Sequence, residues 1–79
     1  MIFLNLDSLD KVSKLVKVCE KYDIDMDIVY GRYIINGKSV LGVSSLMGNI
    51  VKINPITDDK LLLGYIVKDL EPIGAWVQN

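Results

Sequence analysis

The sequence predicts an α+β domain in which a four-stranded antiparallel sheet carries three helices on one face. Three observations support this fold class. Apolar residues alternate along several short segments, as in half-buried strands, and they recur at three and four residues along longer segments, as in amphipathic helices. The connections between segments are short, which favours antiparallel neighbours with the helices gathered on one side. The predicted order is β-α-β-β-α-β-α within one domain of residues 1–79.

The chain begins with a predicted strand at residues 2–6, where aliphatic residues occupy every second position. Asp7 and Ser8 then offer two candidate N-caps for the first helix. The apolar face of that helix repeats at three and four residues and consists of Leu9, Val12, Leu15, Val16, Cys19 and Tyr22. Because Cys19 lies on this face, we expect a buried structural thiol rather than a reactive one.

A hairpin is predicted next. Residues 25–30 alternate as a half-buried strand, and residues 33–35 return as its antiparallel partner. The glycine-containing pair at 31–32 supplies a tight turn between them. The Asn-Gly pair at 36–37 is an alternative hairpin tip, with residues 38–40 as the return strand.

Three aspartates stand at alternate positions around the first of these strands, namely Asp23, Asp25 and Asp27. This spacing is similar to the start of a calcium-binding loop. No glycine or later glutamate completes such a loop, and the alternation places two of the carboxylates on the solvent face. We therefore expect no metal site there.

A short helix and another strand follow. Ser39 is the expected N-cap of the helix, which is predicted over residues 40–46 and contains the poor helix former Gly42. Residues 50–56 alternate as the next strand. Pro55 has no amide hydrogen for a strand ladder, so we expect it at the end of that strand.

The last helix is predicted from an apolar face made of Leu62, Leu63, Ile66, Val67 and Leu70. Thr57 or Asp58 is expected as its N-cap, and the Glu-Pro pair at 71–72 ends it. The tail over residues 73–79 is apolar and carries the only tryptophan, Trp76. We expect this tail to pack back on the domain, with contact to a partner as the alternative.

Composition narrows the function classes. The chain is 51% hydrophobic, so it can build a core, and its single cysteine forms no internal disulfide. A formal net charge of −1 argues against nucleic-acid binding, which needs a concentrated basic face. No run of apolar residues is long enough to span a membrane, and residues 1–12 turn polar too early for a signal peptide, so a cytoplasmic protein is expected. The sequence contains no histidine, which removes the commonest general base and metal ligand; no cofactor is expected.

The stretch at residues 38–46 is the candidate functional segment. A serine suited to cap a helix is followed by the apolar residues Val40, Leu41 and Val43. Exposed apolar clusters on a small protein usually mark an interface. Helical spacing does not allow all three side chains to point the same way, so we expect a mixture of exposed and core positions.

The order of segments and this stretch resemble HPr, the small phosphocarrier family of the bacterial sugar phosphotransferase system. The family's typical run K-S-I-M-G-V-M-S-L is similar to residues 38–46, which read K-S-V-L-G-V-S-S-L. The resemblance covers residues 8–46 directly and continues after Met47 with a short deletion. It implies the HPr-like open-faced β-sandwich, and it favours the hairpin turn at residues 31–32.

In the HPr family, a histidine in a G-I-H-A-R-P-A motif opens the first helix and carries the phosphate. The corresponding residues here read D-S-L-D-K-V, so that Ser8 stands at the histidine position and Asp10 at the arginine position. A serine phosphoester is far less labile than phosphohistidine, and Asp10 would repel a phosphate. The resemblance therefore implies a histidine-less paralogue, similar to Crh, that does not relay phosphate and uses Ser8 and Asp10 for binding.

Ser39 matches the serine that HPr kinase phosphorylates in Gram-positive members of the family, where the product acts through a transcription regulator. The resemblance thus implies phosphorylation at Ser39, a kinase or transcription regulator as protein partner, and a docking patch that includes Val40, Leu41 and Val43. A phosphate at a helix N-terminus meets unpaired N–H groups. The alternative is that Ser39 is only an N-cap, worth about 1 kcal/mol.

Three other classes of function remain open. Chains of β-α-β-β-α-β order also build small-ligand-sensing regulatory domains, although these usually have a glycine-bearing loop after the first strand, which residues 7–10 lack. An enzyme is disfavoured, because the sequence offers no histidine and no phosphate-cradling glycine loop, and its cysteine lies on an apolar face. A purely structural role is the third alternative.

Overall fold

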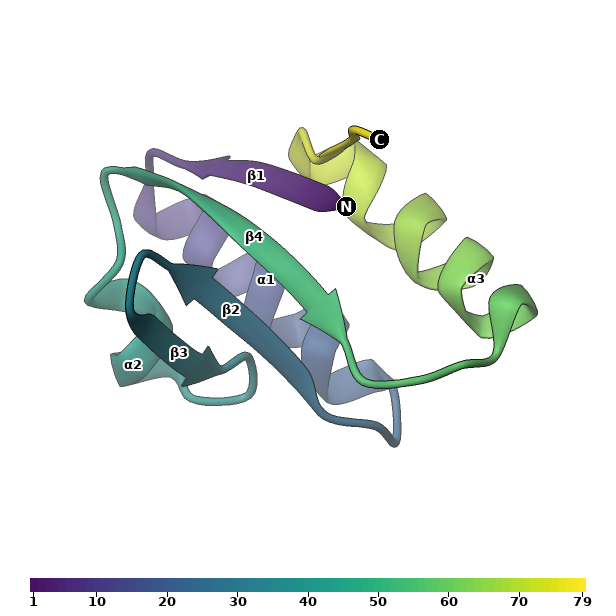
Figure 1. Cartoon of the computed structure of the whole chain (residues 1–79). Coiled ribbons are helices and arrows are strands. Elements are labelled where there is room, and N and C mark those ends of the chain that lie inside the picture. The colour runs from purple at the N-terminus through teal and green to yellow at the C-terminus, as the bar shows by residue number, and fades with distance from the viewer.

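The computed structural model describes residues 1–79 and contains one five-stranded antiparallel sheet with helices on one face (Figure 1). The elements are β1 (Ile2–Leu6), α1 (Leu9–Lys21), β2 (Met26–Tyr30), β3 (Tyr33–Asn36), α2 (Val40–Ser44), β4 (Asn49–Pro55), α3 (Lys60–Leu70), the 3-10 helix η1 (Glu71–Ile73) and β5 (Trp76–Val77). The strands lie in the order β3-β2-β4-β1-β5. The predicted fold class is confirmed, with one strand more than expected.

The helices share one side of the sheet because α1 crosses behind it. In Figure 1, α1 lies behind β1, β4 and β2, and it packs against both α2 and α3. The connection through α1 carries the chain from β1 to β2, and the later strand β4 fills the place between them. The helices therefore cover one face of the sheet and leave the other face open.

Strand register explains which residues form the core. Ile53 in β4 is paired with Ile2 in β1 and with Ile28 in β2, and all three are buried on the helix side. Successive residues of a strand point to opposite faces, so this register sends the alternate positions to the open face. A cluster of 16 buried hydrophobic residues results, and no buried side-chain nitrogen or oxygen lacks a hydrogen-bond partner.

Helix α1 begins at one of its two candidate caps. Ser8 Oγ accepts a hydrogen bond from the Lys11 backbone N–H at 3.2 Å, which satisfies a donor that has no partner within the helix. Asp7 instead pairs with the Lys11 ammonium at 3.2 Å, and Asp10 pairs with Lys14 at 3.0 Å. These pairs join residues four apart on the exposed side of the helix, while its other side enters the core.

The start of α3 differs from the prediction. Asp59, rather than Thr57 or Asp58, is the N-cap: its Oδ1 accepts hydrogen bonds from the backbone N–H groups of Leu61 at 3.0 Å and Leu62 at 3.2 Å. Thr57 has a different task, because its Oγ1 accepts from the Asp59 N–H at 3.1 Å. Residues 57–59 are all of types that make good N-caps. The turn places Asp59 directly before the helix, so Asp59 takes this position.

The tail packs back on the domain, as expected, and does so as a strand. Strand β5 pairs with β1, where Trp76 stands opposite Phe3 and their rings stack with centroids 5.9 Å apart. The Met1 amino group donates to the Gln78 carbonyl at 2.9 Å, and the two chain ends lie together in Figure 1. Strand β5 has only two residues, too few to produce a recognisable alternation.

None of the three helices combines the length and the apolar character that crossing a membrane requires.

Candidate functional site

The candidate site begins at the N-terminus of α2. Ser39 is exposed and caps this five-residue helix, with its Oγ accepting from the Gly42 N–H at 3.2 Å. Asn36 Oδ1 accepts from the Lys38 N–H at 2.9 Å and so fixes the turn that precedes the cap. Both hydrogen bonds are local, and together they present Ser39 at the surface.

Gly42 allows α2 to lie close to the sheet. A Cβ atom at this position would come within 2.6 Å of Ile35 Cγ2 on β3, far inside van der Waals contact. The glycine therefore weakens the helix by propensity but permits its packing. This close approach determines which side of the short helix is buried.

The three apolar residues of the predicted patch separate into two groups. Leu41 is 85% exposed and Val40 is 55% exposed, whereas Val43 is fully buried in the core. Helical geometry makes this separation necessary, since a helix one turn long that packs on β3 must bury one of its sides. The expected mixture is present, and Val43 is removed from the set of surface-binding residues.

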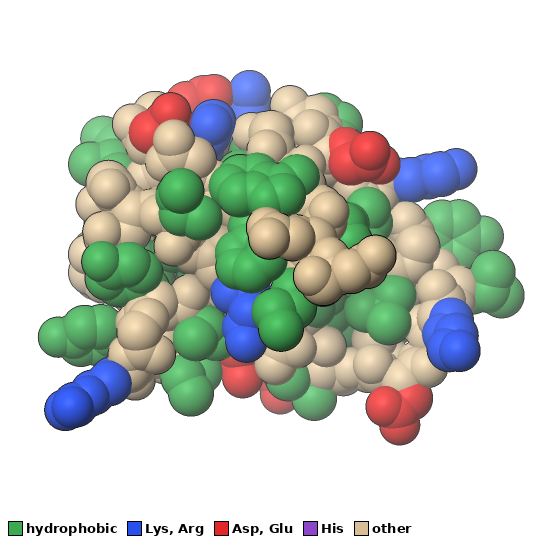
Figure 2. Space-filling model, turned by 45° about the horizontal axis from the view of Figure 1, so that its top comes forward, with side chains coloured by type: hydrophobic (Ala, Val, Ile, Leu, Met, Phe, Trp, Pro, Cys, Tyr) green, Lys and Arg blue, Asp and Glu red, His purple; other side chains and the backbone are tan.

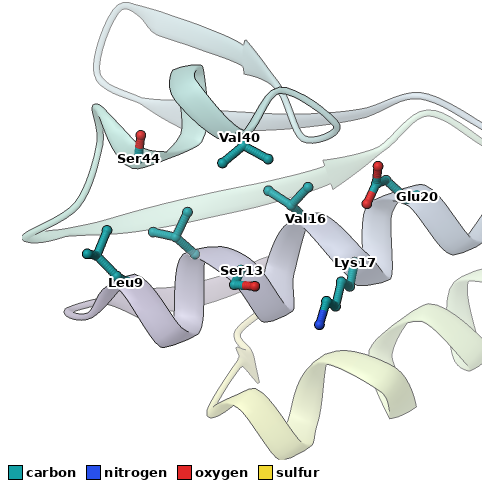
Figure 3. Close-up of a pocket in the computed structure, with 8 residues that line it drawn as sticks. Leu9, Ser13, Val16, Lys17, Glu20, Val40 and Ser44 are labelled. Atoms are coloured by element: carbon teal, nitrogen blue, oxygen red, sulfur yellow. The ribbon is translucent and has the colours of Figure 1, made fainter.

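An apolar groove runs between α1 and α2, next to Val40. It has a volume of about 310 Å³ and is lined by Leu9, Val12, Ser13, Val16, Lys17, Glu20, Val40 and Ser44. Figure 3 shows Val40 of α2 and Val16 of α1 pointing towards one another, with Leu9 near one end and the charged Lys17 and Glu20 near the other. The groove is open, and its lining follows α1 from Leu9 to Glu20, which suits a side chain or segment of a protein better than an enclosed small molecule.

The two predicted binding residues of α1 do not line this groove. Ser8 is half-buried and engaged as the helix cap, and Asp10 is exposed and paired with Lys14. Leu9, which lies between them, does line the groove and is exposed. The periodicity of α1 assigns Leu9 to the core face, but Leu9 is the first residue of the helix and its side chain is 65% exposed.

Sequence reasoning missed most of the α1 side of the groove. Ser13, Lys17 and Glu20 succeed one another at four and three residues, which places them along one side of a helix. That spacing was available in the sequence. Nothing in it marked these polar residues as the border of a groove, because the border depends on where α2 packs.

Cys19 is buried in the core beneath α1. Burial raises the pKa of its thiol to about 11, although the charge of Lys38 opposes part of this change. The backbone of Gly37 packs against it so closely that a Cβ there would lie 2.5 Å from the sulfur atom. The expectation of a buried structural thiol is confirmed.

A second polar cluster ties the end of α1 to α3. Asp69 Oδ2 accepts hydrogen bonds from the Tyr22 hydroxyl at 2.5 Å and from the Lys21 ammonium at 2.8 Å. The bonds from Lys21 and Tyr22 lower the pKa of Asp69. Partial burial, followed by this bond to a carboxylate, raises the pKa of Tyr22 to about 12. The cluster connects two helices, and none of its three residues lines the groove.

The fold is similar to that of a solved HPr protein. HPr-C-His from Thermoanaerobacter tengcongensis superposes with a TM-score of 0.66 at 20% sequence identity, and the match covers 89% of this chain and 89% of that one. This likeness establishes an HPr-like fold. No protein-family model matches the sequence, and a search of curated proteins gives no match either.

Proposed function

We propose that this protein is a non-catalytic, HPr-like regulatory protein that binds protein partners through α2 and the neighbouring groove. The observation that supports this most directly is the exposure of Val40 and Leu41 beside an apolar groove on an HPr-like fold. Side chains of this kind lose contact with water when a partner covers them, and that supplies binding energy. The site contains no histidine, and the only thiol is buried.

Ser39 is the proposed control point of this surface. Its hydroxyl is exposed and directly precedes Val40, so a phosphate there would add about −2 charge at the edge of the apolar patch. The first turn of α2 contains no acidic residue that would repel it. By resemblance to HPr and Crh, the expected partners are a serine kinase of the HPr kinase type and a transcription regulator that recognises the phosphorylated form.

The small-ligand-sensing alternative has less support. The loop between β1 and α1 would have to receive the ligand, but Asp7 is paired with Lys11 and Ser8 caps the helix. No glycine in that loop opens a path for a ligand to the backbone.

The first experiment measures phosphorylation. The protein is incubated with HPr kinase and ATP, and its intact mass is compared with that of Ser39→Ala and of Ser45→Ala, a nearby exposed serine that serves as the control. We expect one added phosphate in the wild type and in Ser45→Ala, and none in Ser39→Ala. If the wild type gains no phosphate, regulation of Ser39 by that kinase is refuted.

A second experiment tests the docking surface by itself. Binding of the unmodified protein to immobilised HPr kinase is compared between Leu41→Ala and Leu61→Ala, which removes another strongly exposed leucine, from α3. We expect about tenfold weaker binding for Leu41→Ala only, as for loss of a central apolar contact. Equal binding by both variants would contradict the role of α2.

A further inference from the structure

The open face of the sheet carries a row of side chains that crosses all five strands. The register fixes this cross-strand row: Trp76 on β5 stands opposite Phe3 on β1, Phe3 opposite Lys52 on β4, Lys52 opposite Val29 on β2, and Val29 opposite Ile34 on β3. Because directly paired residues point to the same face, the five side chains form one line across the surface. It lies on the side away from the groove between α1 and α2.

This row is apolar for a solvent-facing sheet. Ile34 is 65% exposed and Trp76 is 39% exposed, and Ile50, beside the row on β4, is 54% exposed. Figure 2 shows hydrophobic side chains gathered across the middle of one face with few charged groups among them. The solvent-facing side of an antiparallel sheet usually carries polar residues. The apolar side chains on this side are therefore typical of a surface that another molecule covers.

Within its strands, the open face carries one basic and one acidic side chain, and Asp25, directly before β2, adds a second carboxylate at its edge by the same alternation. Lys52 belongs to the row, and Asp27 lies two residues before Val29 on β2, where it stands opposite Asn54. The two charges are therefore diagonal neighbours on adjacent strands, with Cα atoms about 7–8 Å apart. Neither takes part in any of the three ion pairs of the protein. The other polar residues that alternate to this face are the uncharged amides Asn5, Asn36 and Asn54.

We propose that the open face binds a second copy of this chain, sheet against sheet. A two-fold axis that lies between the two sheets and bisects the line from Lys52 to Asp27 sets each Lys52 opposite the Asp27 of the other copy. Both charges then gain a partner, and the two rows cross near Val29 and Ile34, whose side chains cover those of the other copy. Such self-complementarity is the requirement of an isologous interface.

A second copy suits these charges better than a strongly charged partner does. A nucleic acid or a basic peptide would need a strong excess of one sign, but the strands of this face carry one charge of each sign. The size of the molecule, 30 × 24 × 22 Å, limits the contact to the lower range of specific interfaces, so the dimer is weak and depends on concentration. The groove between α1 and α2 stays accessible in it.

Sedimentation velocity over a concentration series from about 10 μM to about 1 mM tests the proposal. We expect the wild type to shift from monomer to dimer within this range. Lys52→Glu places two acidic groups opposite each other and should raise the dissociation constant at least about tenfold. The double variant Asp27→Lys with Lys52→Glu restores opposite charges and should return to within about threefold of the wild type.

Lys60→Glu, an exposed charge reversal at the start of α3, is the matched control and should dimerise as the wild type does. Circular dichroism verifies that each variant is folded. A wild type that stays monomeric at the highest concentration overturns the proposal. So does a dimer that Lys52→Glu does not weaken, or a double variant that does not recover.

Discussion

Helices α1 and α2 start in the same way and differ in everything that follows. Each has a serine N-cap whose Oγ accepts from the backbone N–H three residues later at 3.2 Å. Helix α1 then continues for 13 residues with four of them buried and two ion pairs on its exposed side. Helix α2 ends after five residues, buries one, and exposes two apolar side chains. An identical cap thus serves a structural helix in one place and a surface segment in the other.

The largest expected difference comes from the same substitution in the two helices. Leu15 in α1 is fully buried, and Leu15→Ala should lower the free energy of unfolding by about 2–5 kcal/mol, since it leaves a cavity. Leu41 in α2 is exposed, and Leu41→Ala should change the free energy of unfolding by no more than about 0.5 kcal/mol. Urea denaturation of both variants measures this. A large loss for Leu41→Ala would mean that α2 belongs to the stabilising core.

A smaller difference in stability is expected when the two serine N-caps, Ser8 and Ser39, are replaced by alanine. Ser8→Ala should lower the free energy of unfolding by about 1 kcal/mol, because it leaves a donor of a long, packed helix without its partner. Ser39→Ala should cost less in global unfolding, since α2 can open locally while the rest stays folded. Urea denaturation gives the first quantity, and amide hydrogen exchange at Gly42 and Val43 reports the local opening. Equal global losses would contradict the view that α2 is the more independent helix.

The smallest effect concerns the polar cluster of Lys21, Tyr22 and Asp69, which connects α1 to α3 and has no counterpart in α2. The raised pKa of Tyr22, about 12 against an ordinary value near 10, means that this group contributes stability that is fully present below pH 10 and is lost as the pH rises through 12. The Tyr22→Phe variant has no such proton, so its stability should fall less steeply between pH 10 and 12. Denaturation midpoints at several pH values test this, and parallel profiles for the two proteins would refute it.

Low pH should weaken the same polar cluster, because Asp69 then loses its negative charge. Asp69 has a lowered pKa in the folded protein, so its contribution is present above the pKa of the unfolded chain, near 4, and is lost as the pH falls through its folded value. The same denaturation series, continued below pH 4, compares the wild type with Asp69→Asn. The variant should be less stable at neutral pH, and the difference should shrink as the pH falls.

The parts of the fold that follow from local periodicity were predictable. The alternation of residues 2–6 and the repeat of apolar positions in α1 each indicate one element, and the structure has both where they were expected. The cap of α3 was not predictable in the same way, since Thr57, Asp58 and Asp59 have similar intrinsic preferences and only the path of the chain distinguishes them. Strand β5 exists only because β1 offers it an edge.

The surfaces were less predictable than the elements. The sequence identified Val40 and Leu41, but the burial of Val43 depends on how Gly42 lets α2 approach β3. The cross-strand row combines residues from five strands that are spread over most of the chain. Its members are adjacent only through the register, which the spacing of residues within any one strand does not reveal.

Because the two chain ends lie side by side, the same fold could form from a chain that begins at a different element. Met1 and Gln78 exchange two backbone hydrogen bonds, from the Met1 amino group to the Gln78 carbonyl at 2.9 Å and from the Gln78 N–H to the Met1 carbonyl at 2.8 Å. A short peptide linker could join them and new termini could be opened at the exposed turn of residues 31–32, giving a circular permutant with the same sheet. In that permutant β5 and β1 would become a hairpin, and the contact that now spans almost the entire chain would become its most local one.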